Sequence, residues 1–482
     1  MPAMHETENE AQAQAYIGTA TDLGRPCPGA ARSRVHPTRG RTARAAAALR
    51  AVMGAVLVLA GMPSAHAQTA PAPTLAPTPA PALTGEVLLV LRQADALPGL
   101  QARHRLALVG RFGQRPIYRL RVPPRQSIDA TIAALAAEPA VLVAEPNLRR
   151  HAPEGVKNNV WAVGRAESVA TQWAGPALQA PLARTMGQGG RGVRVALLDT
   201  GFDLQHPALA GRWLPGRDFV DGDLDPSDQS APARHGHGHG THVAGLVAWM
   251  APEARLMPLR VLDDDGQGNA WVLAEALMHA IDPDGNPATD DGAHVVNLSL
   301  AGAGRSRLMA TVHALASCNL PDADHPDIDL SDPGYAADRE RCGRAAGAVV
   351  VAAAGNDGGT QAVYPAAEGA YGLLAVAASH AEGRLASFSN RGGWVHVSAP
   401  GEAVHSTVPG GAYAGWSGTS MAAALASGSV ALARAAHPQR SAREITRCLT
   451  RTAQPLAERD APPQLRPADA LIRLAQGPRA CR

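Results

Sequence analysis

The chain has 482 residues, of which 46% are hydrophobic and 18% charged, and its formal net charge is +2. This composition predicts two or three mostly globular domains with a large buried core and argues against extensive disorder. The low net charge, without a basic block, argues against a dedicated nucleic-acid binder, so no nucleic-acid partner is expected.

The N-terminal region has the layout of a signal peptide. Arginines precede an apolar run over residues 51–61, and the small-x-small sequence Ala65-His66-Ala67 follows. This pattern predicts a signal peptide over residues 1–67, with a long n-region, and a mature protein that is secreted or periplasmic and has no membrane anchor. The apolar run is shorter than the roughly 20 residues that span a bilayer. The alternative reading is a buried core helix.

Residues 68–83 are rich in proline and alanine, which predicts a semi-rigid linker. The following segment, 84–155, predicts a small α+β domain. Its expected elements are strands over residues 86–91, 117–122 and 141–145 and an amphipathic helix over residues 127–137.

In the remaining segment, 156–482, short apolar strands alternate with helical stretches. The expected strands include residues 193–198, 295–300 and 348–353, and the expected helices include residues 241–250, 270–281 and 420–436. Alternation of this kind predicts an α/β fold with three layers, in which helices cover both faces of a mostly parallel sheet. Functional sites in such folds gather at the carboxyl ends of the strands.

The cysteines fit an exported protein, in which disulfides can form. Cys27 would leave with the signal peptide, and four cysteines would remain, which allow three pairings. Proximity in the sequence favours Cys318–Cys342 and Cys448–Cys481. The alternative is four free, buried thiols.

Two segments place reactive polar groups beside predicted buried elements. Asp199 ends the apolar run VRVALLD, although an aspartate in this position is more often a cap or turn residue. His239 lies just before a predicted helix, in the segment HGHGHGTHVAG, between glycines that permit close backbone approach. Metal binding by His235, His237 and His239 is an alternative, but no supporting ligand has the spacing typical of zinc sites.

Two further segments complete the candidate constellation. Ser420 begins a long helix of small residues in WSGTSMAAALASG, where it is either an N-cap or a nucleophile at the positive end of a helix dipole. Asn356 follows a buried strand in VVAAAGNDG, where it is either a turn residue or an oxyanion donor. Each signal is weak by itself, and the order Asp, His, Asn, Ser makes the set informative.

The chain contains the motifs VALLDTGFDLQHPAL, HGTHVAG, VVNLSL, AAAGNDG, SAPG and GTSMA. These motifs and the order of the four residues resemble the subtilisin-like serine peptidase family from about Gly190 to about Ala435. The resemblance implies a serine endopeptidase that forms an acyl-enzyme on Ser420. His239 would be the general base and Asp199 would orient it, while Asn356 and the Ser420 amide would stabilise the oxyanion. No cofactor is required by this chemistry.

The resemblance also places a substrate cleft and a specificity pocket. The strand that pairs with substrate would be NLSLAG, and DGQGN (265–269) would form the opposite wall; the substrate-binding residues expected there are Ser299, Leu300, Ala301, Gly302, Gly266 and Gly268. Val363 stands where the family often has glycine at the base of the first pocket. A valine should shorten this pocket and favour small or medium apolar residues before the cleaved bond.

One departure from the family pattern follows the serine. Ala424 and Leu425 occupy the positions where the family usually has proline and histidine. Without the proline, the helix is expected to be straighter, which could move Ser420 slightly, and a shift of about 1 Å can cost on the order of 100-fold in rate. A catalytically impaired homologue that serves as a binding or chaperone module is therefore the alternative function. An α/β-hydrolase esterase ranks last, because GTSMA lacks the second glycine of the nucleophile motif and the order of the residues is wrong.

The segment 84–155 resembles the inhibitory propeptide of the same family. The sequence VLVAEPNLRRHAP would be its C-terminal end and would fit the cleft as a product-like strand, with cleavage between Asn147 and Ala174. The alternative is an unrelated interaction domain. Besides this intramolecular inhibitor, protein or peptide substrates are the expected partners. Calcium is left open: the acidic stretch 282–292 and the loop between Cys318 and Cys342 lack EF-hand spacing, so no metal site is assigned.

Overall fold

The computed structural model describes residues 82–156, 162–320, 333–477 and 479–481. The predicted signal peptide (1–67), Cys27 and most of the predicted linker lie outside the described residues. Among the helices that are described, none is both long and apolar enough to cross a membrane.

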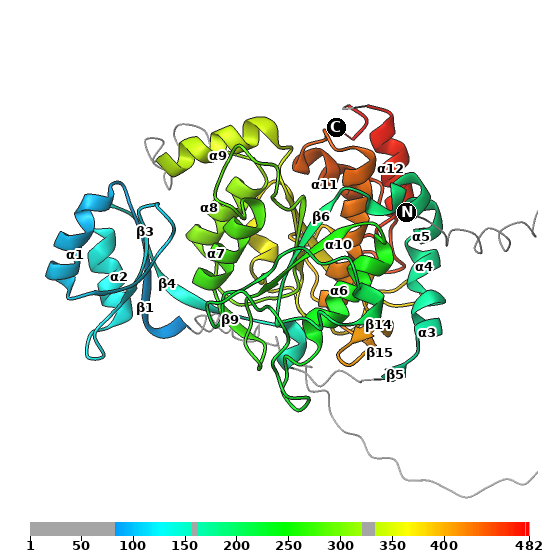
Figure 1. The fold of residues 1–482 in the computed structure, drawn as a ribbon, viewed down its shortest axis with the longest axis horizontal. Helices are drawn as coiled ribbons and strands as arrows, with labels where there is room; N and C mark the ends of the chain where they lie inside the picture. The colour runs from blue at the N-terminus through cyan, green and yellow to red at the C-terminus, as the bar shows by residue number, and fades with distance from the viewer. Residues whose placement is uncertain (1–81, 157–161, 321–332, 478, 482) are drawn as a thin grey trace, which may run out of the picture. The chain divides into compact units, whose positions relative to one another are not determined.

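The first described elements form a small antiparallel sheet with the strand order β2-β3-β1-β4-β9 (Figure 1). The expected strands and helix are present as β1 (Ala82–Leu91), β3 (Ile117–Arg121), α2 (Ile128–Ala136) and β4 (Val141–His151). Strand β1 starts inside the predicted linker. The sequence did not predict α1 (Leu97–His104) or β2 (Ala107–Arg111). Helix α1 contains Pro98 and Gly99 and β2 is largely exposed, so neither has a clear sequence signal.

Strand β4 is longer than the sequence predicts. The prediction ended at Glu145, whereas the strand continues to His151 and its last three residues pair with β9 (Gln267–Asn269). The added residues, Pro-Asn-Leu-Arg-Arg-His, are mostly polar and lack a regular alternation with apolar ones, so pairing with a distant strand makes them extended. This strand joins the small sheet to the larger body of the molecule.

The larger body is built on a seven-stranded sheet with the order β13-β12-β11-β10-β6-β8-β7, and neighbouring strands are parallel. The strands are β6 (Arg194–Asp199), β7 (Arg217–Asp218), β8 (Arg255–Arg260), β10 (Val295–Leu298), β11 (Val349–Ala353), β12 (Leu373–Ser379) and β13 (Val397–Pro400). Strand β10 is two residues shorter than predicted, so Ser299 and Leu300 lie just beyond its carboxyl end.

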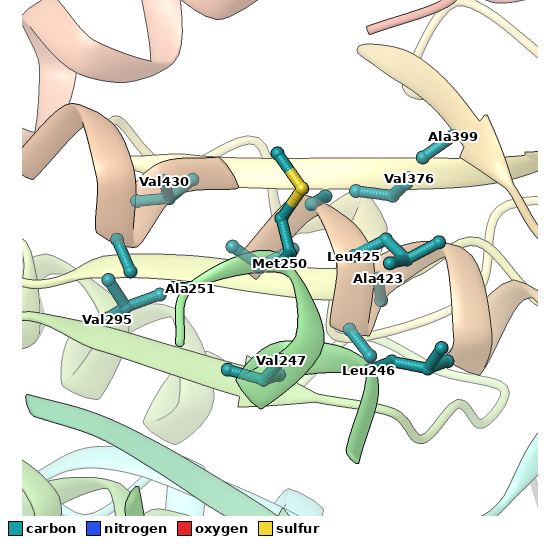
Figure 2. Packing of buried hydrophobic residues seen from close by; sticks show 14 of the residues in the cluster. Leu246, Val247, Met250, Ala251, Val295, Val376, Ala399, Ala423, Leu425 and Val430 are labelled. Carbon is teal, nitrogen blue, oxygen red and sulfur yellow. The ribbon is translucent and has the colours of Figure 1, made fainter. Parts of the chain in front are cut away.

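Helices cover both faces of this sheet, as the α/β prediction requires. Val195 and Leu197 of β6 belong to a core cluster that includes α6 (His239–Met250) and α10 (Thr419–Ala436), part of which Figure 2 shows. Ala196 and Leu198 alternate to the opposite face and pack with α7 (Ala270–Ile281) and α8 (Arg307–Ala316). The period of two along β6 therefore divides one strand between two cores.

Shorter elements surround these layers. A three-stranded sheet has the order β14-β15-β5. The remaining elements are β5 (Ala162–Gly164), β14 (Val404–Val408), β15 (Ala412–Trp416), α3 (Ala166–Ala170), α4 (Ala174–Ala177), α5 (Ala180–Met186), α9 (Pro333–Arg344), α11 (Ala442–Arg451), α12 (Pro467–Ala475) and the 3-10 helices η1 (Ala94–Ala96), η2 (Pro153–Val156), η3 (Gln188–Gly190), η4 (Pro207–Leu209) and η5 (Ala366–Glu368).

Both expected disulfides are present. Cys318 bonds Cys342, with Cα atoms 5.3 Å apart, and Cys448 bonds Cys481, with Cα atoms 5.1 Å apart. The second disulfide ties the segment after α12 back to α11, and both of its cysteines are buried.

We predict that Cys448→Ala combined with Cys481→Ala lowers the free energy of unfolding by roughly 3 to 4 kcal/mol. The disulfide closes a loop with a sequence separation of 33, and its loss lets the unfolded chain gain entropy. Thermal unfolding of the oxidised protein and of the double variant measures this change. An unchanged transition temperature would contradict the prediction.

Candidate active site

The carboxyl ends of the parallel strands bring Asp199 and His239 together. Asp199 is the last residue of β6, and His239 is the first residue of α6 rather than a residue ahead of the helix. The helix approaches the strand end closely at Gly240, where a Cβ would lie 2.2 Å from the Gly201 carbonyl oxygen. Only a residue without a side chain allows this approach.

A short hydrogen bond joins the two side chains. His239 Nδ1 donates to Asp199 Oδ1 over 2.6 Å, and both side chains are buried. The same oxygen accepts the Thr200 backbone N–H at 2.8 Å. Behind it, Arg260 Nε donates to the Thr200 carbonyl at 3.2 Å, which fixes the turn that follows β6. These contacts fix the orientation of the His239 ring, so that Nδ1 faces Asp199 and Nε2 points away from Asp199.

Ser420 is the second residue of α10 and is fully buried. It is not the N-cap, which is Gly418. Its hydroxyl lies 3.3 Å from the Ser299 carbonyl oxygen, and Ser299 Oγ donates to the Ser420 carbonyl at 3.0 Å. These contacts hold the first turn of α10 against the end of β10.

Asn356 follows β11 and points its amide N–H₂ into the site. Thr419 determines this orientation, because its backbone N–H and its hydroxyl both donate to Asn356 Oδ1, at 2.9 and 2.8 Å. These two donors occupy the amide oxygen, and the amide nitrogen donates to a carboxylate in the site. Sequence reasoning did not assign this positioning role to Thr419, although the residue lies in the word GTSMA.

A fifth side chain, which the sequence analysis missed, joins these residues. Glu154, in the 3-10 helix that follows β4, places its carboxylate between them. Its Oε2 accepts from Ser420 Oγ at 2.7 Å and from His239 Nε2 at 3.0 Å. Its Oε1 accepts from Asn356 Nδ2 at 3.0 Å and from the Ser420 N–H at 3.4 Å. The sequence holds no signal for this contact, because a Pro-Glu-Gly stretch ordinarily indicates a turn.

The two carboxylates strongly affect the imidazole between them. Burial by itself disfavours a charged His239, yet Asp199 and then Glu154 outweigh it and raise the His239 pKa to about 10. Burial likewise opposes the charge on Glu154, but hydrogen bonds and the charge of His239 lower the pKa of Glu154 below its ordinary value. His239 and Glu154 therefore form a buried ion pair at neutral pH.

The expected cleft residues line the end of β4. His151 exchanges backbone hydrogen bonds with Ala301, with N···O distances of 2.9 and 2.8 Å, and the Ala152 N–H donates to the Gly266 carbonyl at 2.9 Å. Gly302 lies beneath this strand, since a Cβ there would be 2.7 Å from the Arg149 carbonyl oxygen.

Strand β9 lies on the other side of β4, where Gly268 pairs with Arg150. Leu300 is fully buried. Val363 is half-buried, and its Cγ2 lies 3.2 Å from the place that a Cβ on Gly355 would occupy, next to Asn356. The structure thus places all of the predicted cleft residues around one chain segment or beside the reactive groups.

The two residues that depart from the family pattern are part of the core. Ala424 and Leu425 are fully buried in α10, which runs without interruption from Thr419 to Ala436. Leu425 packs among residues such as Leu246 and Val376 (Figure 2). An apolar side chain here fills core volume, and Ser420 keeps its contacts with Ser299.

The histidines of the HGHGHG segment do not form a metal site together. His237 Nδ1 donates to the Ser230 carbonyl oxygen at 2.9 Å, and His239 is engaged with Asp199. Among the described residues, the group that could hold a metal ion is Asp282, Asp284 and Asp291, within the acidic stretch noted above. It offers three of the about six to eight oxygens that calcium takes, and we assign no ion to it.

Comparison with known proteins agrees with this geometry. The model of the subtilase family matches residues 190–469. A thermophilic serine proteinase from Bacillus sp. strain AK1 is 33% identical over 341 residues, which are 69% of this chain and 72% of that protein. Thermitase from Thermoactinomyces vulgaris is 35% identical over 291 residues, which are 58% of this chain and 87% of thermitase.

Among solved structures, fervidolysin from Fervidobacterium pennivorans, a keratinolytic enzyme related to subtilisin, has a similar fold, with a TM-score of 0.61 and 23% identity. The similarity covers 82% of this chain and 61% of fervidolysin, and at this identity it concerns the fold alone. The predicted α/β architecture is thereby confirmed. The family match, the identities and the fold together show that this chain belongs to the subtilase family of serine endopeptidases.

Proposed function

We propose that Ser420, His239 and Asp199 are the catalytic triad of this endopeptidase, with Asn356 as oxyanion donor. The observation that carries the proposal is that one carboxylate, that of Glu154, is bound at once by the Ser420 hydroxyl, the His239 ring, the Asn356 amide and the Ser420 N–H. A planar group with two oxygens thus occupies the place where a scissile carbonyl and its developing oxyanion would have to lie.

The reaction follows from this arrangement once the carboxylate has left. His239 Nε2 takes the Ser420 proton as the hydroxyl oxygen attacks the substrate carbonyl carbon, and the carbonyl oxygen becomes an oxyanion held by Asn356 Nδ2 and the Ser420 N–H. His239 then gives the proton to the leaving amine, which completes the acyl-enzyme. Water hydrolyses the ester by the same steps, and Asp199 stabilises the charged imidazole throughout.

We further propose that residues 84–155 form a propeptide that inhibits the catalytic domain, 156–482, from within the chain. Strand β4 lies in the cleft as an extra strand between β9 and Ala301. The chain turns at Pro153, which has no N–H to donate to the cleft, and the Glu154 carboxylate then fills the reactive centre. Cleavage between Asn147 and Ala174 would free the mature enzyme.

A secreted or periplasmic location is part of this proposal. The signal-peptide pattern over residues 1–67 supports it, and so do the two disulfides, which are typical of oxidising compartments. A preference for small or medium apolar residues before the cleaved bond is supported by the position of Val363 beside Gly355, next to the oxyanion donor.

Ser420→Ala should abolish peptide hydrolysis, lowering turnover by about six orders of magnitude as in subtilisin, because the nucleophile is lost. Wild type should also react with a fluorophosphonate probe and the variant should not. Mass analysis of N-termini should find self-processing in wild type alone. A wild-type protein that binds peptides but neither reacts with the probe nor cleaves would instead favour the catalytically impaired binding module.

Glu154→Gln should let self-processing begin at a lower pH. In wild type the His239 pKa is raised to about 10, so the ion pair is complete at neutral pH and is lost as the pH rises through that value. The Glu154 pKa is lowered, so at the acidic end the pair is lost only as the pH falls below the ordinary glutamate range. Removing the Glu154 carboxylate lowers the His239 pKa, so the neutral imidazole that acts as the base is present at a lower pH.

The measurement is the rate of appearance of the mature N-terminus as a function of pH. Glu167→Gln, which removes an exposed carboxylate on α3, is the matched control and should follow the wild-type profile. Identical profiles for Glu154→Gln and wild type would show that this carboxylate does not restrain the base.

Val363→Gly should deepen the first specificity pocket. We expect kcat/KM for peptides with phenylalanine before the cleaved bond to rise on the order of tenfold relative to alanine peptides, because room is made for several more carbon atoms. Val363→Ala should give an intermediate ratio. The proposed pocket would be wrong if wild type already preferred arginine or phenylalanine and the ratio did not change.

A further inference from the structure

A buried arginine of the cleft-bound strand lies in a pocket of the catalytic domain. Arg150 belongs to β4, and the residue is almost completely buried, with 1% of its surface exposed. Its Nη1 donates to the Ala303 carbonyl at 3.3 Å and its Nη2 to the Gly304 carbonyl at 3.1 Å, while Nη1 also reaches the Arg149 carbonyl at 2.8 Å. Burial lowers the Arg150 pKa to about 10, so its guanidinium remains charged at neutral pH.

The walls of this pocket are shaped for a guanidinium group. A Cβ on Gly302 would lie 3.0 Å from Arg150 Cδ and 3.2 Å from Nη1, so the glycine leaves room for the side chain. His313 lies on α8, and burial and then the positive charge of Arg150 lower the His313 pKa to about 4. It is uncharged at neutral pH and does not repel a cation.

One carboxylate of the catalytic domain complements the buried cation. The side chain of Glu368 is fully buried, and its Oε2 forms an ion pair with Arg305 at 3.3 Å. Its Oε1 is buried without a hydrogen-bond partner among the described residues. Burial raises the Glu368 pKa to about 7, against hydrogen bonds from Arg305 and the Ser306 backbone and against the charges of Arg305 and Arg150. A buried carboxylate oxygen without a donor is costly unless a cation lies near it.

A second carboxylate, Glu145, also interacts with Arg150 but belongs to the same strand. Glu145 accepts from the Ser306 hydroxyl and from two backbone N–H groups at the start of α8. It would leave the cleft together with Arg150 when the proposed propeptide is removed. Glu368 and the carbonyls of Ala303 and Gly304 would remain.

The strand register relates the pocket to the bond that is cleaved. His151 pairs with Ala301 in an antiparallel arrangement. Two residues forward from His151 therefore correspond to two residues back from Ala301, so residue 153 lies opposite Ser299. The Ser299 carbonyl oxygen lies 3.3 Å from Ser420 Oγ, which marks this position as the residue before the scissile bond, P1. Counting back along the strand places Arg150 at P4.

We propose that the mature enzyme has a guanidinium-binding P4 subsite formed by Gly302, the carbonyls of Ala303 and Gly304 and the Glu368 carboxylate. Its preferred substrates would be peptides with arginine three residues ahead of the apolar P1 residue. The proposal rests on the proposed function and concerns a different pocket from that of Val363. Glu368 is a specificity-determining residue and takes no part in the chemistry.

The test measures kcat/KM of the self-processed enzyme on three quenched fluorescent peptides with one apolar P1 residue and with arginine, citrulline or leucine at P4. Citrulline keeps the shape of arginine and removes its charge. We expect the arginine peptide to be cleaved about ten- to a hundredfold more efficiently than the citrulline peptide. Glu368→Gln should bring this ratio close to one, whereas Glu382→Gln, an exposed carboxylate paired with Arg384, should keep it.

The outcomes separate the two proposals. No cleavage of any peptide by wild type would overturn the proposed function. Cleavage of all three peptides with equal efficiency would overturn the P4 subsite alone, and this comparison needs no variant to fold. An arginine preference that persists in Glu368→Gln would overturn the assignment of that residue.

Discussion

The hydrogen bond between Asp199 and His239 is the constraint on which the site depends. It requires the end of β6 and the start of α6 to lie in contact, which Gly240 permits, and it fixes which ring nitrogen faces Ser420. The parallel sheet makes this geometry possible, because its strands end at a common edge. Asp199, Ser299 and Asn356 all lie at or just beyond strand ends of that edge.

The hydrogen-bond donors that we propose for catalysis also bind the segment that contains β4 and Glu154. Glu154 accepts hydrogen bonds from the Ser420 hydroxyl, the His239 ring and the proposed oxyanion donor Asn356, and β4 pairs with β9, a wall of the proposed cleft. In the proposed propeptide, this carboxylate would inhibit the enzyme because it binds donors that are arranged for a transition state. Arg150 adds a buried cation and extends this complementarity away from the reacting atoms.

Several elements were predictable because their signals are local. The apolar alternation of β6, the periodicity of α7 and the small residues of α10 each specify an element from a short stretch of chain. The short motifs around Asp199, His239, Asn356 and Ser420 predict a candidate catalytic set in the same way. Helix α1 and the second half of β4 were missed, since a Pro-Gly pair obscures the first and the second is extended only by pairing with β9.

The sequence by itself determined the fold class and the order of the four candidate catalytic residues, because motif spacing and periodicity act over short distances along the chain. It favoured one cysteine pairing among three, and the structure has that pairing. Tertiary structure alone decided that Glu154 occupies the reactive centre, that Thr419 orients Asn356 and that Arg150 is buried near Glu368. These contacts join residues between 63 and 266 positions apart in the chain. A carboxylate in a short 3-10 helix or a guanidinium at the polar end of a strand has no local pattern that reveals its distant partner.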